Sequence, residues 1–246
     1  MEQLLVERGF APSRERARSL ILGGHVTVGG QVVAKAGTAV ALDARIELAV
    51  PDHPYVGRGG LKLAHALDEF GIDVTGRRAL DIGASTGGFT DVLLQRGVKS
   101  VIALDVGRGQ LDWKLRNDPR VRVLEGVNAR SLSRDHVPGE VDIVSIDVAF
   151  ISLRHIFPAL PPVLAPMADI VALVKPQFEA GRAQVGHGGV VRDQVVHEAV
   201  IDAVTQAAST CGLERFGLTR SPITGAAGNV EFLLHLGRGR DSRSRD

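Results

Sequence analysis

The chain has 246 residues, of which 44% are hydrophobic and 23% are charged, a composition typical of globular proteins and a length that accommodates one large domain and a small one. Its formal net charge is +1, so a site for nucleic acid would have to be a local basic patch, because the overall charge does not attract phosphates. Cys211 is the only cysteine, which excludes an internal disulfide and a cysteine-cluster metal site and is typical of a reducing compartment such as the cytoplasm.

The beginning of the chain carries no sign of export or of membrane insertion. Residues Met1 to Gln3 are not a basic segment followed by a long apolar core, which a secretory signal peptide requires. No apolar run approaches the ~20 residues that a membrane-spanning helix needs. We therefore expect a soluble cytoplasmic protein without a membrane partner.

The first fifty residues combine helical and strand-like patterns. Apolar residues recur at helical spacing as far as Leu22, and Ser13 is suited to cap a helix over Arg14–Leu22. Residues 26–28 and 31–33 predict two short strands joined at a Gly-Gly turn. Basic residues gather near the helical segment and form either a solvated helix face or a binding patch: Arg8, Arg14 and Arg18.

The order of these parts resembles the S4 RNA-binding domain over residues 4–50. The resemblance depends on a Gly-x-Val-x-Val-x-Gly hairpin at residues 24–30 and on the arginines before it. It implies that Arg8, Arg14 and Arg18 bind RNA phosphates and that the module recognises shape more than sequence. Members of this family have a few more residues before the first helix, so we expect that helix to be shortened or the true start to lie upstream of Met1.

A proline-bracketed segment, residues 51–54, predicts the boundary between two domains. The glycine-rich residues after it include Arg58, a further candidate for RNA contact. An apolar stripe over residues 61–70 predicts a helix, and Lys62 lies in its first turn, where a lone lysine ordinarily faces solvent. The predicted division is an S4-like domain at 1–50, a linker at 51–60, a large domain at 61–237 and a disordered tail at 238–246.

From Arg78 onward, short apolar runs alternate with helical stretches. Five runs are of the kind found in buried parallel strands and lie at residues 79–82, 101–104, 121–124, 141–146 and 170–174. Two further strand-like segments lie at residues 213–218 and 230–236. Helices are predicted at residues 89–96, 153–164 and 199–211. This alternation predicts an α/β fold with a doubly wound, mostly parallel, seven-stranded sheet and a ligand site at the carboxyl ends of its strands.

The stretch from residue 79 to 90 predicts a strand, a glycine-rich turn and a helix N-terminus, whose free N–H groups suit part of a nucleotide-like ligand. Ser85 breaks the Gly-x-Gly-x-x-Gly pattern of dinucleotide sites, and Phe89 stands where a P-loop has lysine. The remaining pattern, Asp81-x-Gly83-x-x-x-Gly87, resembles motif I of S-adenosylmethionine (SAM) methyltransferases; an ordinary βα turn without a ligand is the alternative. The resemblance implies cofactor contacts from Asp81, Gly83, Ala84, Ser85, Thr86, Gly87, Gly88 and Phe89.

Two further candidates follow the next strands at the same edge. Asp105 ends the second strand, roughly 20 residues beyond the glycine loop, where a carboxylate would accept hydrogen bonds from ribose hydroxyls, with Val106 beside it. The alternative for Asp105 is the N-cap of a following helix. Asn128 comes just after the third strand, at the level where adenine or its ribose would lie.

Four charged residues lie at strand ends or on the helix that leads into the large domain. Asp147 and Lys175 each close a very apolar strand, Glu231 begins the last strand, and Lys62 lies on the helix. Charged side chains are unfavourable at the ends of buried strands unless they are paired or used in chemistry. Each alone has a structural explanation, but together with the glycine loop they predict a reaction centre, in which Asp147 also contacts the cofactor.

This set resembles the Lys-Asp-Lys-Glu tetrad of FtsJ-type ribose 2′-O-methyltransferases, as Lys62, Asp147, Lys175 and Glu231. Together with the S4-like module, the whole chain except its tail resembles the TlyA family, on the segments GRGGLKL (57–63), DIGASTGGFTDVLL (81–94), DVGRGQLDWKLRNDPRV (105–121), VSIDVAFISL (144–153), LVKPQFEAG (173–181) and GNVEFLLHL (228–236). The resemblance implies a SAM-dependent enzyme that methylates the 2′-OH of cytidine in ribosomal RNA, within the small and, in some members, the large subunit. The family has also been named for haemolysin activity.

The resemblance also implies a role for each member of the tetrad. Lys175 would activate the 2′-OH as a base or as a positive charge, while Asp147 and Glu231 would hold the two lysines. The histidines show no metal-ligand spacing, so we expect no metal. Two alternatives stay open: a non-catalytic RNA-binding protein, against which the intact tetrad argues, and a membrane-active haemolysin, for which the sequence offers no long basic amphipathic helix.

Overall fold

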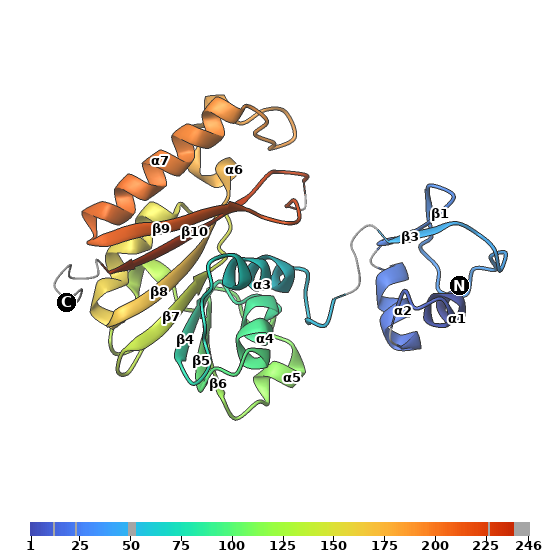
Figure 1. The fold of residues 1–246 in the computed structure, drawn as a ribbon, viewed down its shortest axis with the longest axis horizontal. Coiled ribbons are helices and arrows are strands. Elements are labelled where there is room, and N and C mark those ends of the chain that lie inside the picture. Colours follow the sequence, from blue (N-terminus) through green and yellow to red (C-terminus); the bar gives the residue numbers. More distant parts are fainter. Residues whose placement is uncertain (12, 23, 49–52, 226, 239–246) are drawn as a thin grey trace. The chain divides into compact units, whose positions relative to one another are not determined.

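The computed structural model describes the chain except for residues 12, 23, 49–52, 226 and 239–246. It divides into two compact units, Met1–Pro54 and Tyr55–Asp246 (Figure 1). The first helix of the second unit begins at Gly59, inside the stretch that the sequence suggested as a linker. Pro51 and Asp52 of that linker, and the tail from residue 239 onward, lie outside the described residues.

The first unit consists of two short helices and a three-stranded antiparallel sheet in the order β2-β1-β3. The elements are α1 (Glu2–Glu7), α2 (Arg14–Leu22), β1 (Val26–Val28), β2 (Gln31–Val32) and β3 (Ile46–Leu48). The predicted second helix and hairpin are confirmed. The third strand was not predicted, because it has only three residues and only Ile46 among them is buried. Such a short segment does not show the alternation of apolar and polar residues that identifies a strand.

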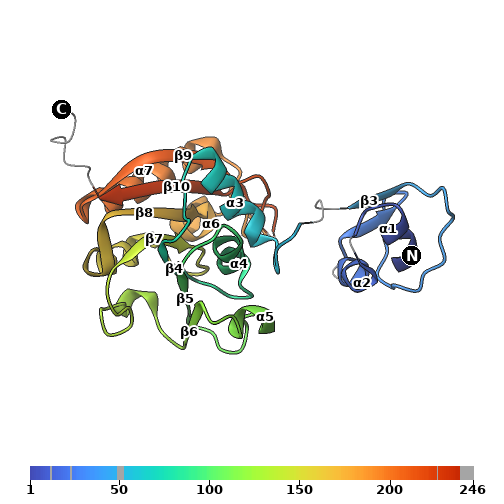
Figure 2. The same cartoon turned by 60° about the horizontal axis from the view of Figure 1, so that its bottom comes forward.

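The second unit is built on a seven-stranded sheet in the order β6-β5-β4-β7-β8-β10-β9, which can be followed across Figure 2. The pairings from β6 to β8 are parallel, whereas β10 is antiparallel to both β8 and β9. The predicted doubly wound, mostly parallel α/β fold is therefore confirmed. The strands are β4 (Arg78–Ile82), β5 (Ser100–Asp105), β6 (Val121–Glu125), β7 (Val141–Ile146), β8 (Leu164–Val174), β9 (Leu213–Arg220) and β10 (Phe232–Arg238).

Helices cover both faces of this sheet. They are α3 (Gly59–Glu69), α4 (Gly88–Gln95), α5 (Trp113–Arg116), α6 (Pro176–Glu179) and α7 (Gln194–Thr210). Successive strand residues point to opposite faces, so that Leu80 enters the core beneath α7 while Ala79 enters the core beneath α3 and α4. The central strands are consequently buried on both sides, which explains their continuous apolar runs.

The predicted helix at residues 153–164 is wrong. These residues form three short 3-10 turns, at Leu153–His155, Phe157–Ala159 and Pro161–Val163. Pro158, Pro161 and Pro162 have no N–H group to donate, and their rings clash with the preceding turn of an α-helix. The apolar spacing still serves the core, because Phe157 is fully buried.

Two other element boundaries differ from the prediction in ways that bear on the site. Helix α7 begins at Gln194 rather than at residue 199, because the Asp193 side chain accepts a hydrogen bond from Val195 N and caps the helix there. Strand β10 begins at Phe232, so Glu231 precedes the strand instead of opening it. Glu231 therefore lies on the loop side of this sheet edge.

The strand order places a crevice between β4 and β7. Strands β5 and β6 continue the sheet on one side of this pair, and β8 continues it on the other. In open α/β sheets, loops diverge at such a switch point and leave room for a ligand beyond the carboxyl ends of the strands.

Candidate functional site

The loop after β4 has a fixed backbone whose glycines the protein's own packing requires. Gly83 N donates to Leu104 O at 2.8 Å, on the neighbouring strand. Gly83 has a φ of +84°, and a Cβ there would lie 2.2 Å from Asp147 O. Gly87, the N-cap of α4, has a φ of +100°, and a Cβ there would lie 2.2 Å from a methyl carbon of Leu115. Only glycine fits these positions without strain.

Asp81, one of the predicted cofactor contacts, lies beneath this loop rather than on its surface. Asp81 is fully buried and accepts hydrogen bonds from Thr90 Oγ1 at 2.6 Å and from Ser145 Oγ at 2.8 Å. Burial raises the pKa of the Asp81 carboxyl to about 6, although both hydroxyl donors oppose the shift. Phe89 is also buried and packs in the core beneath α3 and α4. Asp81 thus supports the loop from below.

A cavity of about 520 Å³, here the larger cavity, opens beside the loop at the carboxyl ends of β4, β5 and β7. Its volume lies within the range of small-molecule sites. Much of its wall is apolar, and a few polar side chains face it. The lining residues from the predicted set are Gly83, Ser85, Asp105, Val106, Asn128 and Asp147.

Asp105 and Asn128 each hold a turn at the rim of the larger cavity. Asp105 Oδ2 accepts from Ser85 N at 2.8 Å and Oδ1 accepts from Gly107 N at 2.7 Å. The alternative of a helix N-cap is excluded for Asp105, because the helix that follows is capped by Asp112 instead. Asn128 Oδ1 accepts from Arg130 N at 3.0 Å. A carboxylate has about four lone-pair sites, so Asp105 keeps acceptor capacity for a ligand hydroxyl.

A second cavity of about 250 Å³, here the smaller cavity, adjoins the first. Asp147 and Ala149 line both cavities, whereas Lys175 and Gly59 line only the smaller one. The loop contributes Gly83, Ala84, Ser85, Thr86, Gly88 and Phe89. A ligand that follows the loop would therefore extend from the larger cavity, with its mostly apolar wall, into the smaller cavity beside Asp147 and Lys175.

The four predicted charged residues form two ion pairs at this edge of the sheet. Lys175 Nζ lies 2.6 Å from Asp147 Oδ1, and Lys62 Nζ lies 2.6 Å from Glu231 Oε2. The Lys62 and Glu231 side chains are only 11% and 3% exposed, so Lys62 is not the solvent-facing lysine that its position alone suggested. Burial of these charges is tolerable because each cation has an anion in direct contact.

An exposed aromatic residue lies at the larger cavity, and the sequence analysis did not identify it as a candidate. Phe150 is 90% exposed, has a φ of +63° and lines the larger cavity. Its ring centroid lies 5.0 Å from that of Phe178, and Lys175 Nζ lies 5.9 Å from the Phe178 centroid. A left-handed backbone is unfavourable for phenylalanine, so this placement is costly to maintain. The available signal was an aromatic residue shortly after the charged end of a buried strand.

The predicted RNA-binding arginines belong to both units. Arg8, Arg14 and Arg18 are exposed in the first unit, and Arg58 is the partly buried N-cap of α3 in the second. Arg14 forms an ion pair with Glu2 at 2.9 Å, and Arg8 Nη1 donates to Ala44 O. These two contacts engage part of the donor capacity of Arg14 and Arg8, so Arg18 is the natural choice for a test of phosphate contact.

Neither a metal centre nor a membrane span is found in the described part of the chain. Among the residues outside the gaps, no group of three His, Cys, Asp or Glu side chains is arranged to hold a metal ion. Within the same residues, no helix combines the length and the apolar character needed to cross a bilayer.

Two family profiles match the chain, one on each side of the boundary between the units. The profile of FtsJ-like methyltransferases matches residues 55–238, and the profile of the S4 domain matches residues 2–46.

Known proteins match over nearly the whole length. The 16S/23S rRNA (cytidine-2′-O)-methyltransferase TlyA of Mycobacterium tuberculosis is 49% identical, over 94% of this chain and 87% of the relative. Hemolysin A of Brachyspira hyodysenteriae is 42% identical, over 96% of this chain and 98% of the relative. A solved structure from Streptococcus thermophilus, described as a candidate hemolysin, superposes with a TM-score of 0.78 at 45% identity, covering 96% of this chain and 87% of that one.

Proposed function

The chain belongs to the FtsJ-like methyltransferases and, within them, to the TlyA family with its N-terminal S4 domain, and from this premise we propose that it methylates the ribose 2′-OH of cytidine in ribosomal RNA, with SAM as the methyl donor. The observation that carries the proposal is the pair of lysine–carboxylate contacts beside the glycine loop. They supply groups that can bind a hydroxyl and move its proton, which an RNA-binding module alone does not need.

SAM fits the two cavities by chemistry. The larger cavity offers apolar walls for an adenine ring, and Asp105 and Asn128 offer polar atoms for a ribose and a base. The smaller cavity follows the loop, whose backbone groups suit the charged methionyl part, and ends at Asp147 and Lys175. When bound, SAM supplies a methyl group activated by a sulfonium. Asp105, Asn128 and the residue 83–88 loop would hold it.

The tetrad prepares the 2′-hydroxyl. A ribose hydroxyl is a poor nucleophile, so a group at its oxygen must accept the proton or stabilise the developing negative charge. We assign this place to Lys175 Nζ, because Lys175 lines the smaller cavity and Asp147 holds its Nζ. Glu231 holds Lys62 in the same way, and the two pairs together balance charge within the site. Alignment of the hydroxyl with the methyl group would supply much of the remaining acceleration.

The first unit and Phe150 bind the RNA in this proposal. Arg8, Arg14 and Arg18 would contact phosphates and so position the substrate without reading its sequence. Because the relative from Mycobacterium tuberculosis is an rRNA methyltransferase, we place the reaction in the cytoplasm, on a ribosomal subunit. An exposed ring beside the reaction centre would stack on a base of the target region.

Substitution of Phe150 tests this stacking. Phe150→Leu keeps apolar volume but removes the aromatic face, and we expect kcat/KM for RNA to fall about 5- to 150-fold, which corresponds to the roughly 1–3 kcal/mol of one base–aromatic stack. Phe150→Tyr should retain most of the activity. Steady-state kinetics with varied RNA measures the effect. Equal activity of the leucine and wild-type proteins would remove Phe150 from the substrate site.

Substitution of Gly83 tests the loop. Gly83→Ala places a Cβ 2.2 Å from Asp147 O and forces alanine into a left-handed conformation, so the loop must move. We expect SAM affinity, measured by calorimetry, to fall at least about tenfold. Gly97→Ala is the matched control, because Gly97 also has a positive φ, of +82°, but a Cβ there meets no atom closer than 3.7 Å and lies away from both cavities. Equal SAM affinity in both variants would contradict the loop assignment.

The function itself is tested with purified protein. Ribosomal subunits incubated with the protein and methyl-labelled SAM should acquire label in 2′-O-methylcytidine, identified by nucleoside mass spectrometry. Label in a base-methylated nucleoside, or in no nucleoside at all, would contradict the proposal.

A further inference from the structure

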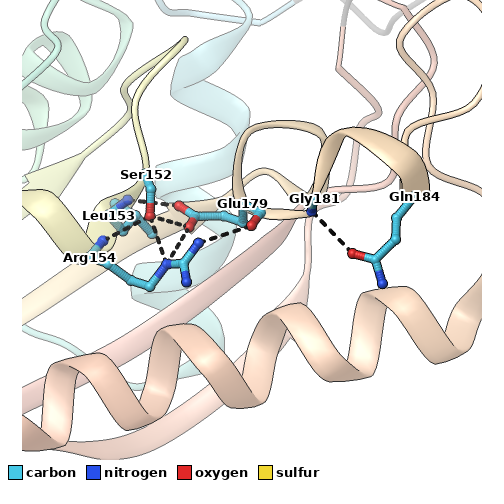
Figure 3. Close-up of polar contacts among 6 residues, drawn as sticks. All are labelled: Ser152, Leu153, Arg154, Glu179, Gly181 and Gln184. Carbon is cyan, nitrogen blue, oxygen red and sulfur yellow. Dashed lines mark hydrogen bonds and ion pairs between the residues drawn. The ribbon is translucent and has the colours of Figure 1, made fainter.

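A buried carboxylate outside the tetrad joins the two loops that carry Asp147 and Lys175. Glu179, at the end of α6, is 8% exposed. Its Oε2 accepts from Ser152 Oγ at 2.5 Å, and its Oε1 accepts from Leu153 N at 2.7 Å (Figure 3). Ser152 and Leu153 belong to the segment that follows β7 and Asp147, whereas Glu179 belongs to the segment that follows β8 and Lys175.

Arg154 closes this cluster from the outside. Its Nε donates to Ser152 Oγ at 3.0 Å, and its Nη2 donates to the Glu179 backbone oxygen at 3.1 Å. Its Nε lies 3.6 Å from Glu179 Oε2, and the Arg154 side chain is 46% exposed, so solvent weakens its compensation of the buried charge. Burial raises the pKa of the Glu179 carboxyl, against the hydrogen bonds from Ser152 and Leu153.

The half-exposed Arg154 compensates the buried charge of Glu179 only in part. Burying a carboxylate in this way costs free energy, which an ordinary turn would not require. The position of Glu179 explains its use. Helix α6 spans only residues 176–179, and a helix of one turn has little stability of its own. The backbone of Lys175, the N-cap of this helix, therefore needs an anchor from another segment. Glu179 provides that anchor on the loop that carries Asp147.

The same two loops meet at three successive places. Asp147 contacts Lys175, the Phe150 ring packs against Phe178, and residues 152–153 contact Glu179. The first two contacts involve groups assigned to the substrate, and only the last is closed from solvent. It is the contact that can set the spacing of the other two.

We propose that Glu179 is a positioning residue, which clamps the segment after β7 to helix α6 and thereby holds the Asp147–Lys175 pair and the Phe150 ring in place for methyl transfer. The expected effect on kcat rests on the proposed function, whereas the contact between the two loops does not depend on it. Loss of the clamp would let the loops separate, and a displacement of about 1 Å in a reaction centre lowers rates by about 10²-fold.

Three variants and a control test the clamp. Glu179→Ala removes both acceptors, and kcat should fall about 10- to 100-fold while the SAM dissociation constant changes less than about threefold. Glu179→Gln keeps the acceptor for Leu153 N but replaces the acceptor of the Ser152 hydroxyl with an N–H donor, so it should recover kcat only in part. Ser152→Ala removes one contact only and should lower kcat less than Glu179→Ala does. It serves as the test if the alanine variant at 179 does not fold.

Asp169→Ala is the matched control. Asp169 is likewise 8% exposed and holds two partners, Arg77 at 2.6 Å and His235 at 2.8 Å, but it lies within β8 away from both cavities. Its loss should lower the melting temperature without changing kcat below that temperature. Unchanged kcat in Glu179→Ala, or a Gln variant as impaired as the Ala variant, would overturn the clamp.

Hydrogen exchange separates failure of the clamp from failure of the proposed function. Amides of residues 148–155 and 175–180 should exchange faster in Glu179→Ala than in the wild type, and should be unchanged in Asp169→Ala. This readout needs no substrate, so an inactive wild-type protein would count against the proposed function alone. Equal exchange of these segments in Glu179→Ala and wild type would refute the clamp whatever the activity.

Discussion

Replacing Lys175 with alanine is expected to slow methyl transfer by about 10²- to 10⁴-fold while folding and SAM affinity stay near those of the wild type, the loss typical of a removed general base. The reason is the position of Lys175, which lines the smaller cavity and whose Nζ lies 2.6 Å from Asp147 Oδ1. Folding should survive, because the Asp147 side chain is 22% exposed and water can solvate it once the lysine is gone. Single-turnover rates at saturating SAM measure the chemical step.

Lys175→Arg distinguishes the two roles that Lys175 could have. A guanidinium stays protonated and cannot take a proton, so a base role predicts little recovery in the arginine variant. Near-full activity of Lys175→Arg would show that the site needs only a fixed positive charge there. Near-full activity of Lys175→Ala would remove Lys175 from the chemistry altogether.

The two ion pairs should behave as one unit in a double-variant cycle. If Lys62 and Lys175 act on the same hydroxyl and set one another's charge, the second substitution adds little once the first has been made. Lys62→Ala combined with Lys175→Ala should therefore lose much less than the product of the two single effects. A loss equal to that product would show independent roles and would contradict the coupled tetrad.

Removal of residues 1–54 is expected to abolish methylation of ribosomal subunits while leaving SAM binding intact. The first unit has its own core, around Leu5, Ala17 and Ile21, and the cores of the second unit are built from residues after position 54. The shortened protein should therefore fold and bind SAM, but it lacks most of the proposed phosphate contacts. If the shortened protein methylated ribosomal subunits at the full rate, the S4 domain would not be needed for substrate binding.

The salt dependence of RNA binding tests the same point with one residue. Arg18→Ala should flatten the slope of log K against log salt by roughly 0.7–0.9, the contribution of one phosphate contact. Lys99→Ala is the matched control, because Lys99 is an exposed cation just before β5, at the edge of the sheet opposite the site. It should leave the slope unchanged. Equal slopes for Arg18→Ala and wild type would exclude Arg18 as a phosphate contact.

The sheet was predictable because its central strands are continuous apolar runs separated by helical stretches. This pattern can be identified along the sequence without knowledge of tertiary contacts. The α-helix predicted at residues 153–164 was wrong because the apolar spacing of three consecutive 3-10 turns is similar to that of an α-helix. The prolines in the segment were the only sequence signal against an α-helix. Strand β3 was too short to show its period.

For the site, Asp147 and Lys175 were predictable because a charged residue at the end of a very apolar strand stands out in the sequence. The pairing of Lys62 with Glu231 did not follow from sequence, because 169 positions separate the two residues and only the fold brings them together. Glu179 left no signal, since a glutamate at the end of a helical segment is ordinarily solvent-exposed. The sequence also did not reveal that Asp81, a conspicuous acid in the loop motif, is fully buried beneath the loop.

Cytidine 2′-O-methylation by this protein can be tested in cells by mapping 2′-O-methyl groups on ribosomal RNA from three strains: one with this gene, one without it and one with its Lys175→Ala form. We expect at least one cytidine to carry a 2′-O-methyl group only in the first strain. Identical maps in all three strains, or a methyl group restored by the Lys175→Ala form, would contradict this expectation.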